Sequence, residues 1–247
     1  MRRFTFAPER LADGRVVFDR DETHHLARVL RLRPGDTVVA SSGDGLDHTI
    51  RIESLGDAAT GTVIGTRARV SESPLDVTLL QGVPKGDKME AIVRMATELG
   101  VRRILPVLTE RTIVRLEPAR WRERARRWQR VAKEATKQCG RALVPDVELP
   151  RPLDACLDAL PEPAPREWRL CVWEGATAPL GPALDAAAVA TCVYLFVGPE
   201  GGLAAHEVDT AARHGFTVAT LGPRVLRTET AGPIVIGVLQ YRLGDLS

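Results

Sequence analysis

The chain has 247 residues, of which 44% are hydrophobic but only 4% aromatic, and its formal charge at pH 7 is +2. This length accommodates one large domain or a small domain joined to a mid-sized one, with a core built mainly from aliphatic side chains. The composition excludes a disordered chain, a collagen and a disulfide scaffold. Taken as an average, the nearly balanced charge gives no reason to expect a nucleic-acid partner.

No targeting or metal-binding signal is evident. The first nine residues carry positive charge but no apolar run behind it, unlike a secretory signal. No stretch approaches the ~18 uninterrupted apolar residues of a membrane span. The cysteines are widely spaced and form no Cys-x-x-Cys pair, which is typical of buried thiols rather than of a zinc cluster. We therefore expect a soluble, cytoplasmic protein with no metal and no membrane partner.

Residues 1–73 are predicted to form a first, strand-rich domain. Its strands are marked by β-branched residues at 37–40, 48–52 and 62–66. One helix, predicted over 21–32, interrupts them. A small β-barrel with a single helix fits this pattern. The segment 71–74 is predicted to be a linker, because the sequence changes character after it.

Residues 74–247 are predicted to form a second domain, in which strands alternate with helices. The predicted strands are 77–80, 101–108, 170–173, 193–197 and 216–219. The helix after the first strand carries an apolar stripe of Met89, Ile92, Val93, Ala96 and Leu99 and stops at Gly100. Buried strands alternating with helices indicate an α/β fold with a mostly parallel sheet covered on both faces.

An excess of positive charge lies on one predicted helix, at 118–138, and on the residues just after it. The segment from Pro118 to Arg141 holds seven Arg and two Lys against Glu123 and Glu134, so its charge is +7 and the rest of the chain sums to 2 − 7 = −5. Trp121 and Trp128 keep a helical spacing with three alanines and predict a buried face. The cations on the other faces form either a solvated surface or a stripe that contacts phosphates. A weaker basic cluster lies at 28–33.

Two glycine-bearing loops follow predicted strands. The first, 197–203, leaves an apolar strand and precedes a helix that begins near Ala204. Its glycines permit close approach of a ligand to the backbone, at the strand end where α/β sheets bind ligands. It is neither a G-x-G-x-x-G fingerprint nor a P-loop, and a purely structural turn is the alternative.

The second loop, 221–231, also joins a strand to a helix. It holds two Arg, one Glu and two Thr, a composition that favours a polar site over a core, and helix N-terminal amides there would meet a carboxylate or phosphate. Pro233 is expected within the first turn of the helix that follows. A zinc-protease motif is excluded, since the pair His206-Glu207 has Thr210 where a second histidine would stand.

Together the two loops, GPEGGL at 198–203 and LGPRVLRTETA at 221–231, resemble the methyltransferases of the SPOUT superfamily. Within it the sequence is most similar to the 16S ribosomal RNA uridine-N3 methyltransferase (RsmE) family. Further similar segments are 25–31, 88–90, 98–101 and 134–141. The resemblance runs from the first residues to position 245.

The resemblance implies a fold, a cofactor and partners. Residues 1–73 would form a PUA-like RNA-binding barrel, and residues 74–247 a SPOUT α/β domain with a deep trefoil knot, a rare exception to ordinary chain topology. The methyl donor would be S-adenosylmethionine. The enzyme would be an obligate homodimer that methylates N3 of one uridine near the decoding centre of 16S rRNA, on the assembled 30S subunit.

Site residues also follow from the resemblance. Arg227 or Arg224 would stabilise the uracil anion, and Glu200 or Glu229 would accept the N3 proton, although Glu200 acting only as a loop brace is an alternative. The residues expected to bind the cofactor are Leu195, Phe196, Val197, Gly198, Pro199, Gly201, Gly202, Leu221, Gly222, Val225, Leu226 and Thr230. Those expected to contact RNA are Arg2, Arg3, Arg28, Arg31, Arg33, Arg120, Arg124, Arg127, Arg130, Lys133 and Lys137.

Three alternatives stay open from the sequence. A ribose 2′-O-methyltransferase of the same superfamily, acting on rRNA or tRNA, would share the cofactor and the knot. A non-catalytic RNA-binding factor of ribosome assembly would use only the barrel and the basic helix. A small-molecule enzyme would fit the sheet, but it would leave the charged helix without a role.

Overall fold

A computed structural model describes residues 3–43, 45–68 and 72–246. The chain divides into two compact units. The first comprises Met1–Glu72 and Glu134–Val144, and the second comprises Ser73–Lys133 and Pro145–Ser247. The sequence pattern predicts one boundary between the two domains, at residue 73. The structure instead groups Glu134–Val144 with the first unit.

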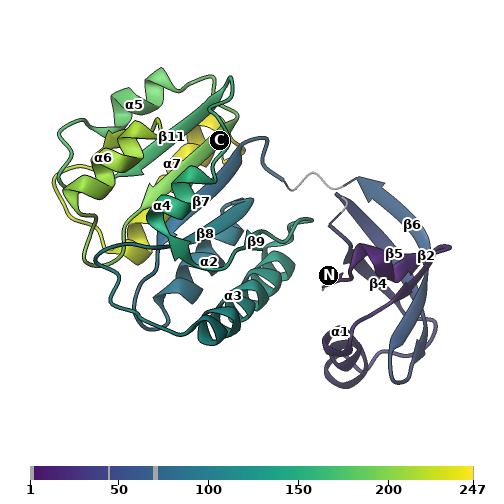
Figure 1. The fold of residues 1–247 in the computed structure, drawn as a ribbon. Helices are drawn as coiled ribbons and strands as arrows, with labels where there is room; N and C mark the ends of the chain where they lie inside the picture. The colour runs from purple at the N-terminus through teal and green to yellow at the C-terminus, as the bar shows by residue number, and fades with distance from the viewer. Residues whose placement is uncertain (1–2, 44, 69–71, 247) are drawn as a thin grey trace. The chain divides into compact units, whose positions relative to one another are not determined.

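The first unit is built on a six-stranded sheet with the order β1-β4-β5-β6-β3-β2 (Figure 1). Its elements are β1 (Arg3–Thr5), a 3-10 turn (Pro8–Arg10), β2 (Leu11–Ala12), β3 (Arg15–Val17), α1 (Arg20–His24), a π-helical turn (His25–Val29), β4 (Thr37–Ser41), β5 (Leu46–Leu55) and β6 (Ala59–Ala68). The three predicted strands are confirmed as β4, β5 and β6. The predicted helix is confirmed as α1 with its π-helical continuation.

Phenylalanine and aliphatic side chains fill the core of this unit. Phe4, Phe18 and Ile50 are all buried in one cluster. The segment Glu134–Val144 is held to the unit by polar contacts. Lys137 Nζ lies 2.5 Å from Glu22 Oε1, and Ser41 Oγ donates to the Ala142 carbonyl at 2.9 Å. These contacts explain why the end of a helix of the second unit groups with the first.

The second unit contains a seven-stranded sheet in which every pairing is parallel, as predicted. The order is β10-β8-β7-β12-β11-β13, and β9 pairs with β8. The strands are β7 (Asp76–Gly82), β8 (Arg103–Leu108), β9 (Asp146–Val147), β10 (Arg151–Pro152), β11 (Glu167–Val172), β12 (Cys192–Val197) and β13 (Thr217–Ala219). The two-residue strands β9 and β10 were not predicted, because two residues are too few to show an apolar run or an alternation of apolar and polar side chains.

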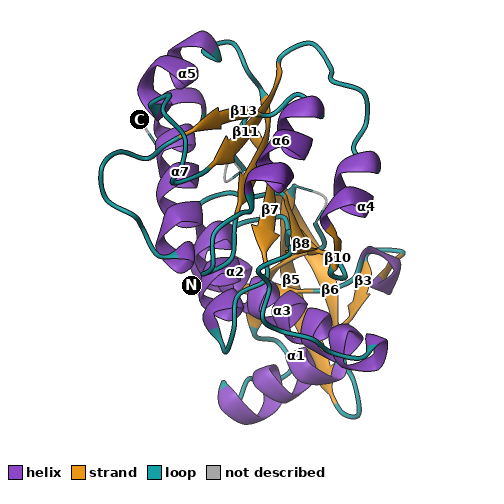
Figure 2. Ribbon diagram, turned by 60° about the vertical axis from the view of Figure 1, so that its left-hand side comes forward, coloured by secondary structure: helices purple, strands orange, loops and turns teal. Residues whose placement is uncertain are grey.

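Helices cover both faces of this sheet (Figure 2). They are α2 (Lys88–Glu98), α3 (Pro118–Cys139), α4 (Leu153–Asp158), α5 (Leu180–Ala186), α6 (Ala205–Arg213) and α7 (Thr228–Leu243). The prediction that Pro233 lies in the first turn of the last helix is wrong. That helix begins at Thr228, with Arg227 as its N-cap, so Pro233 lies in the second turn. Among the described residues, no helix is long and apolar enough to cross a membrane.

Candidate active site

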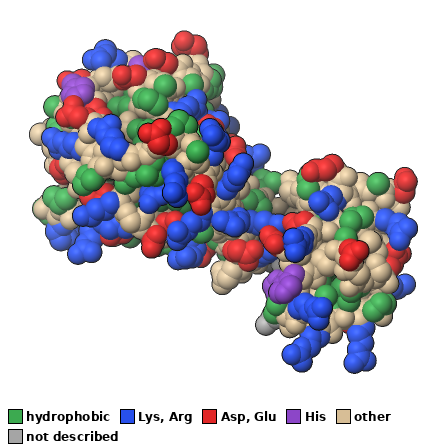
Figure 3. Space-filling view, turned by 60° about the horizontal axis from the view of Figure 1, so that its bottom comes forward, with side chains coloured by type: hydrophobic (Ala, Val, Ile, Leu, Met, Phe, Trp, Pro, Cys, Tyr) green, Lys and Arg blue, Asp and Glu red, His purple; other side chains and the backbone are tan. Residues whose placement is uncertain are grey.

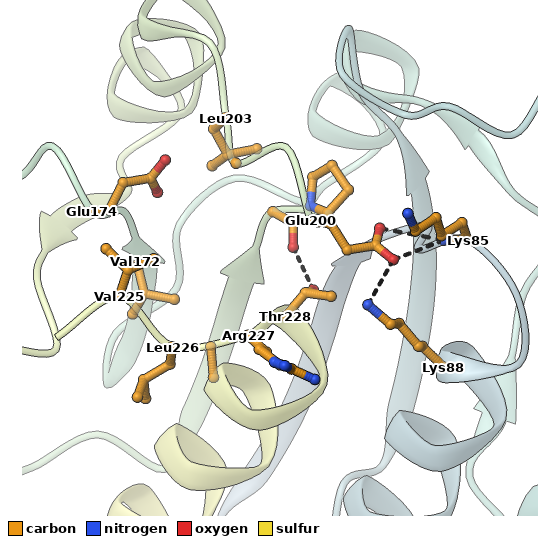
Figure 4. Close-up of a pocket in the computed structure, with 14 residues that line it drawn as sticks. Lys85, Lys88, Val172, Glu174, Glu200, Leu203, Val225, Leu226, Arg227 and Thr228 are labelled. Atoms are coloured by element: carbon orange, nitrogen blue, oxygen red, sulfur yellow. Dashed lines mark hydrogen bonds and ion pairs between the residues drawn. The ribbon is translucent and has the colours of Figure 1, made fainter.

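A cavity of about 360 Å³ opens at the carboxyl ends of the central strands. Its walls come from the two glycine-bearing loops, from the start of α2 and from the end of β11 (Figure 4). The lining residues are Lys85, Lys88, Val172, Glu174, Gly198, Pro199, Glu200, Gly202, Leu203, Val225, Leu226, Arg227, Thr228 and Ala231. Because parallel strands end on the same edge of a sheet, segments far apart in sequence meet here.

Close backbone approach shapes the first loop. A Cβ on Gly82, at the end of β7, would lie 2.5 Å from the backbone nitrogen of Pro199. Gly202 has φ +69°, and a Cβ there would collide with the Glu174 carboxylate. Side chains at these two positions would push the loop away from the strand ends.

A lysine links two of the predicted catalytic carboxylates. Lys88 Nζ lies 3.1 Å from Glu200 Oε1 and 3.5 Å from Glu229 Oε2. Arg227 extends the cluster, with its NH1 4.0 Å from Glu229 Oε1 and a side chain that is 83% exposed. The cluster therefore holds two cations and two anions beside the cavity, and the guanidinium is its accessible member.

The hydrogen bonds of Glu200 determine its acidity. Partial burial would raise the pKa of this carboxyl, but its own backbone amide, the Lys88 ammonium and the Lys85 amide outweigh burial and hold the pKa below its usual value. The Lys85 amide donates at 3.2 Å to Oε1. In return, the hydrogen bond to Glu200 raises the pKa of Lys88. Glu200 is thus a stabilised carboxylate and a weak base.

A second cavity of about 360 Å³ adjoins the first and shares the wall formed by Val225 and Leu226. Thr220, Leu221 and Gly222 line its other side. Gly222 has φ +105° and no atom within 4 Å of the place where a Cβ would stand, so its backbone faces open space.

The two cavities fit a nucleoside-type cofactor. They combine apolar walls for a base with exposed loop backbone for hydrogen bonds, and the Glu174 carboxylate lines both and offers an acceptor for hydroxyl or amino groups. A third cavity, of about 520 Å³, shares Leu221, Gly222 and Leu226 with the second and also includes Thr230. Most of the predicted cofactor-binding residues line these three cavities: Gly198, Pro199, Gly202, Leu221, Gly222, Val225, Leu226 and Thr230.

Four predicted cofactor-binding residues line none of these cavities. Leu195, Phe196 and Val197 lie in β12 with buried side chains, so they support the loop from within the sheet. Gly201 instead accepts a hydrogen bond from Arg111 NH1 at its carbonyl. The prediction also omitted Lys85, Lys88, Glu174, Thr228 and Ala231 from the site. Thr228 and Ala231 lie in the second similar loop, 221–231, and Lys88 lies in the shorter similar segment 88–90, whereas Lys85 and Glu174 had no signal in the sequence.

Four arginines of α3 line a separate cavity of about 340 Å³, together with Leu116 and Glu123. They are Arg120, Arg124, Arg127 and Arg130. Arg127 is already engaged, since its Nε lies 3.0 Å from Glu90 Oε1. Arg124 is half-buried and, within the part of the chain that the structure describes, has no ion-pair or hydrogen-bond partner.

The other predicted RNA contacts differ in accessibility. Arg28, Arg31 and Arg33 are exposed. Lys133 is half-buried. Lys137 is only 11% exposed and is paired with Glu22 and Glu134, so its charge is compensated inside the first unit. The backbone of Arg3 belongs to β1, and Arg2 lies outside the described residues.

An apolar groove of about 630 Å³ runs between α2 and α7. Ile234 and Tyr241 are 52% and 62% exposed, although the opposite side of α7 buries Val235 and Leu239 in the core. The groove also includes Glu229 and Thr230, so it begins next to the active-site cluster. A helix that is apolar on both sides is expected to be covered on both.

Comparison with known proteins agrees with this geometry. The family model of an RNA methyltransferase domain matches residues 71–240, and that of an RNA methyltransferase PUA domain matches residues 18–59. The chain is 34% identical to ribosomal RNA small subunit methyltransferase E from Synechocystis, over 98% of this chain and 78% of that one. It is 29% identical to the protein of the same name from Bacillus subtilis, over 90% of this chain and 88% of the relative.

Two solved structures extend the similarity to the fold. The ribosomal RNA small subunit methyltransferase E of Neisseria gonorrhoeae, bound to S-adenosyl methionine, is 34% identical, covers 100% of both chains and has a TM-score of 0.88. A methyltransferase of Legionella pneumophila, in complex with the same cofactor, is 30% identical, covers 99% of this chain and 98% of its own, and also has a TM-score of 0.88.

Proposed function

The chain belongs to the RNA methyltransferase family that includes ribosomal RNA small subunit methyltransferase E, and from this premise we propose that it methylates N3 of a specific uridine in 16S rRNA with S-adenosylmethionine as donor. The observation that carries the proposal is the meeting of the two glycine-bearing loops around a cavity that also holds Lys88, Glu200 and Arg227. Full-length similarity to two cofactor-bound methyltransferases supports the same cofactor at the same place.

The chain's own residues fit the cofactor. Backbone groups of Leu221, Gly222 and Leu226 would hold the adenosine part, and Val225 and Leu226 would flank the base. When bound, S-adenosylmethionine supplies an electrophilic methyl group. The protein has to hold the nucleotide in line with that group and exclude water from it.

Removal of the uracil imide proton leaves negative charge on the ring, which we propose that Arg227 stabilises. Its guanidinium lines the cavity and is largely exposed, whereas Lys88 is committed to Glu200 and Glu229. Glu200 and Glu229 are the candidate proton acceptors. The three hydrogen bonds to Glu200 favour its bracing role, because a carboxylate that is stabilised in this way accepts a proton poorly.

The Glu200→Gln substitution separates the two roles of Glu200. We expect the single-turnover methylation rate to fall by less than about tenfold, since loss of a general base costs about 10²- to 10⁴-fold. The glutamine retains an oxygen that can accept the hydrogen bond from the Lys85 amide, although the substitution removes the ion pair with Lys88. Rapid-quench measurements on saturated complexes give the rate. A loss of a hundredfold or more would make Glu200 the base and exclude simple bracing.

The RNA backbone is proposed to follow the arginine-lined cavity of α3, with the exposed arginines at 28–33 as a second contact. Arg124→Glu should weaken RNA binding and reduce the salt slope by about one or two phosphate contacts, at about 0.7 to 0.9 each. Binding would be measured by titration at several salt concentrations. Arg213→Glu on α6, outside the proposed path, is the matched control. If the salt dependence of RNA binding were unchanged in Arg124→Glu, this face of α3 would be an ordinary solvated surface and not an RNA contact.

The finer assignments are also proposals. The target uridine near the decoding centre, the assembled 30S subunit as substrate, the cytoplasmic location and the trefoil knot rest on the family resemblance. The apolar groove between α2 and α7 supports a homodimer. Likewise, we propose residues 1–73 as the RNA-binding domain and residues 74–247 as the methyltransferase domain.

One experiment tests the reaction and its substrate together. Thirty-S particles and naked 16S rRNA are incubated with the protein and labelled S-adenosylmethionine, and the methylated atom is mapped by mass spectrometry. We expect one N3-methyluridine, formed faster on the particle. A methyl group on a ribose 2′-oxygen would overturn the N3 assignment, and no labelling of either RNA would overturn the enzyme assignment.

A further inference from the structure

A glutamine with no assigned role lies at the centre of the sheet. Gln81 is the penultimate residue of β7 and has no exposed surface. A buried amide is costly unless its polar atoms are hydrogen-bonded. Within the described residues Oε1 of Gln81 is buried without a hydrogen-bond partner, and Nε2 makes the contacts. Its contacts therefore indicate which structure this residue maintains.

The Gln81 amide nitrogen reaches three segments. Nε2 lies 3.0 Å from the Gly82 carbonyl at the end of β7, and 3.4 Å from the Gly198 carbonyl in the first loop. It lies 2.9 Å from Thr228 Oγ1, in the first turn of α7. One side chain thus contacts both glycine-bearing loops and the end of β7.

Thr228 completes the connection. Its hydroxyl donates to the Gly198 carbonyl at 2.7 Å and accepts from Gln81, and its side chain is buried. Thr228 follows Arg227 directly and lines the same cavity as Gly198. The hydrogen bond between Thr228 and Gly198 is drawn in Figure 4.

We infer that Gln81 and Thr228 are positioning residues, which fix the separation of the two cofactor-binding loops and hold Arg227 at the cavity. Their polar groups bond to the protein itself, Gln81 Nε2 to Thr228 Oγ1 and the Thr228 hydroxyl to the Gly198 carbonyl. They act through Gly198 on the first loop and through the start of α7 on the second. The inference rests on the proposed function for the identity of the cofactor, but the coupling of the loops does not depend on it.

Thr228→Val tests the inference because it keeps the shape of the side chain and removes the hydroxyl. We expect deuterium uptake in the cofactor-free protein to rise in peptides covering 198–203, far from the substitution in sequence. S-adenosylmethionine affinity, measured by calorimetry, should fall about tenfold or more, since small displacements of positioning groups are costly.

Two variants serve as controls. Thr228→Ser retains the hydroxyl and should keep both exchange and affinity close to wild type. Thr97→Val removes another buried threonine hydroxyl, which donates to the Val93 carbonyl within α2. It should lower the stability of the protein by a similar amount to Thr228→Val, but at a position outside the two loops. Melting temperatures of all three variants show whether their stabilities are comparable.

The outcomes separate this inference from the proposed function. Unchanged exchange at 198–203 in Thr228→Val would overturn the inference, whether or not the protein binds the cofactor. So would equal losses of affinity in Thr97→Val and Thr228→Val. A wild-type protein that bound no S-adenosylmethionine would overturn the proposed function, while raised exchange at 198–203 in Thr228→Val would still support the coupling.

Discussion

Replacement of Arg227 with alanine should lower kcat for methylation by about 10²- to 10³-fold, the cost of removing one group that stabilises developing negative charge. Arg227 is the accessible cation of the cluster, because Lys88 is held between two carboxylates. The affinity for S-adenosylmethionine should change little, since the backbone of the loops is expected to bind it. Single-turnover kinetics and calorimetry measure the two quantities separately.

Arg224→Ala is the matched comparison, because the sequence left open which arginine acts. Arg224 lines the second cavity and not the one that holds Lys88 and Glu200. Its replacement should therefore affect kcat less than that of Arg227. If Arg224→Ala caused the larger fall in kcat, the two roles would be exchanged, and if neither variant lowered kcat, no arginine of this loop would stabilise the anion.

The predictable part of the fold is the part that local sequence determines. Strand β12 is a continuous apolar run, β7 has an apolar centre at 77–80 interrupted only by Thr78, and α2 carries one apolar stripe, so these patterns locate all three elements. The short strands β9 and β10 exist only because they pair with β8, and pairing is not encoded within two residues. The position of Pro233 was wrong by one turn for a related reason, since loop composition does not fix where a helix begins.

Only the parts of the site that are contiguous in sequence could be predicted. Both glycine-bearing loops could be identified from their composition and resemblance, and they do line one region of the structure. Lys88 and Gln81 were not assigned to the site, because they lie on other elements and reach the loops only through the parallel sheet. A glutamine in an apolar strand is a signal of buried hydrogen bonding, but it does not reveal its partners.

The structure also refines the charge analysis. The average of +2 hides a segment of +7, which points to RNA, but not every cation in that segment is available. Lys137 is paired with Glu22 inside the first unit, and Arg127 is paired with Glu90. On the face shown in Figure 3, Lys and Arg side chains are interspersed with Asp and Glu. This distribution favours a few defined phosphate contacts over indiscriminate binding.

Ile234→Glu should convert the proposed dimer to a monomer and abolish methylation. Ile234 is 52% exposed and lines the apolar groove between α2 and α7, where a second copy is proposed to bind. A carboxylate buried at such an interface without a partner is strongly destabilising to the complex, while on a free surface it is tolerated. Sedimentation velocity measures the mass of the species, and calorimetry measures its cofactor affinity.

Val189→Glu is the control, because Val189 is 70% exposed and lines none of the cavities described above. It should leave the mass and the activity unchanged. Methylation should be lost with the dimer because Thr230 and Glu229, at the start of α7, line the groove and adjoin the active-site cluster. A partner at the groove would therefore order the segment that carries Arg227. A wild-type protein that sedimented as a monomer would contradict the dimer, and an active monomeric Ile234→Glu would show that one copy suffices for catalysis.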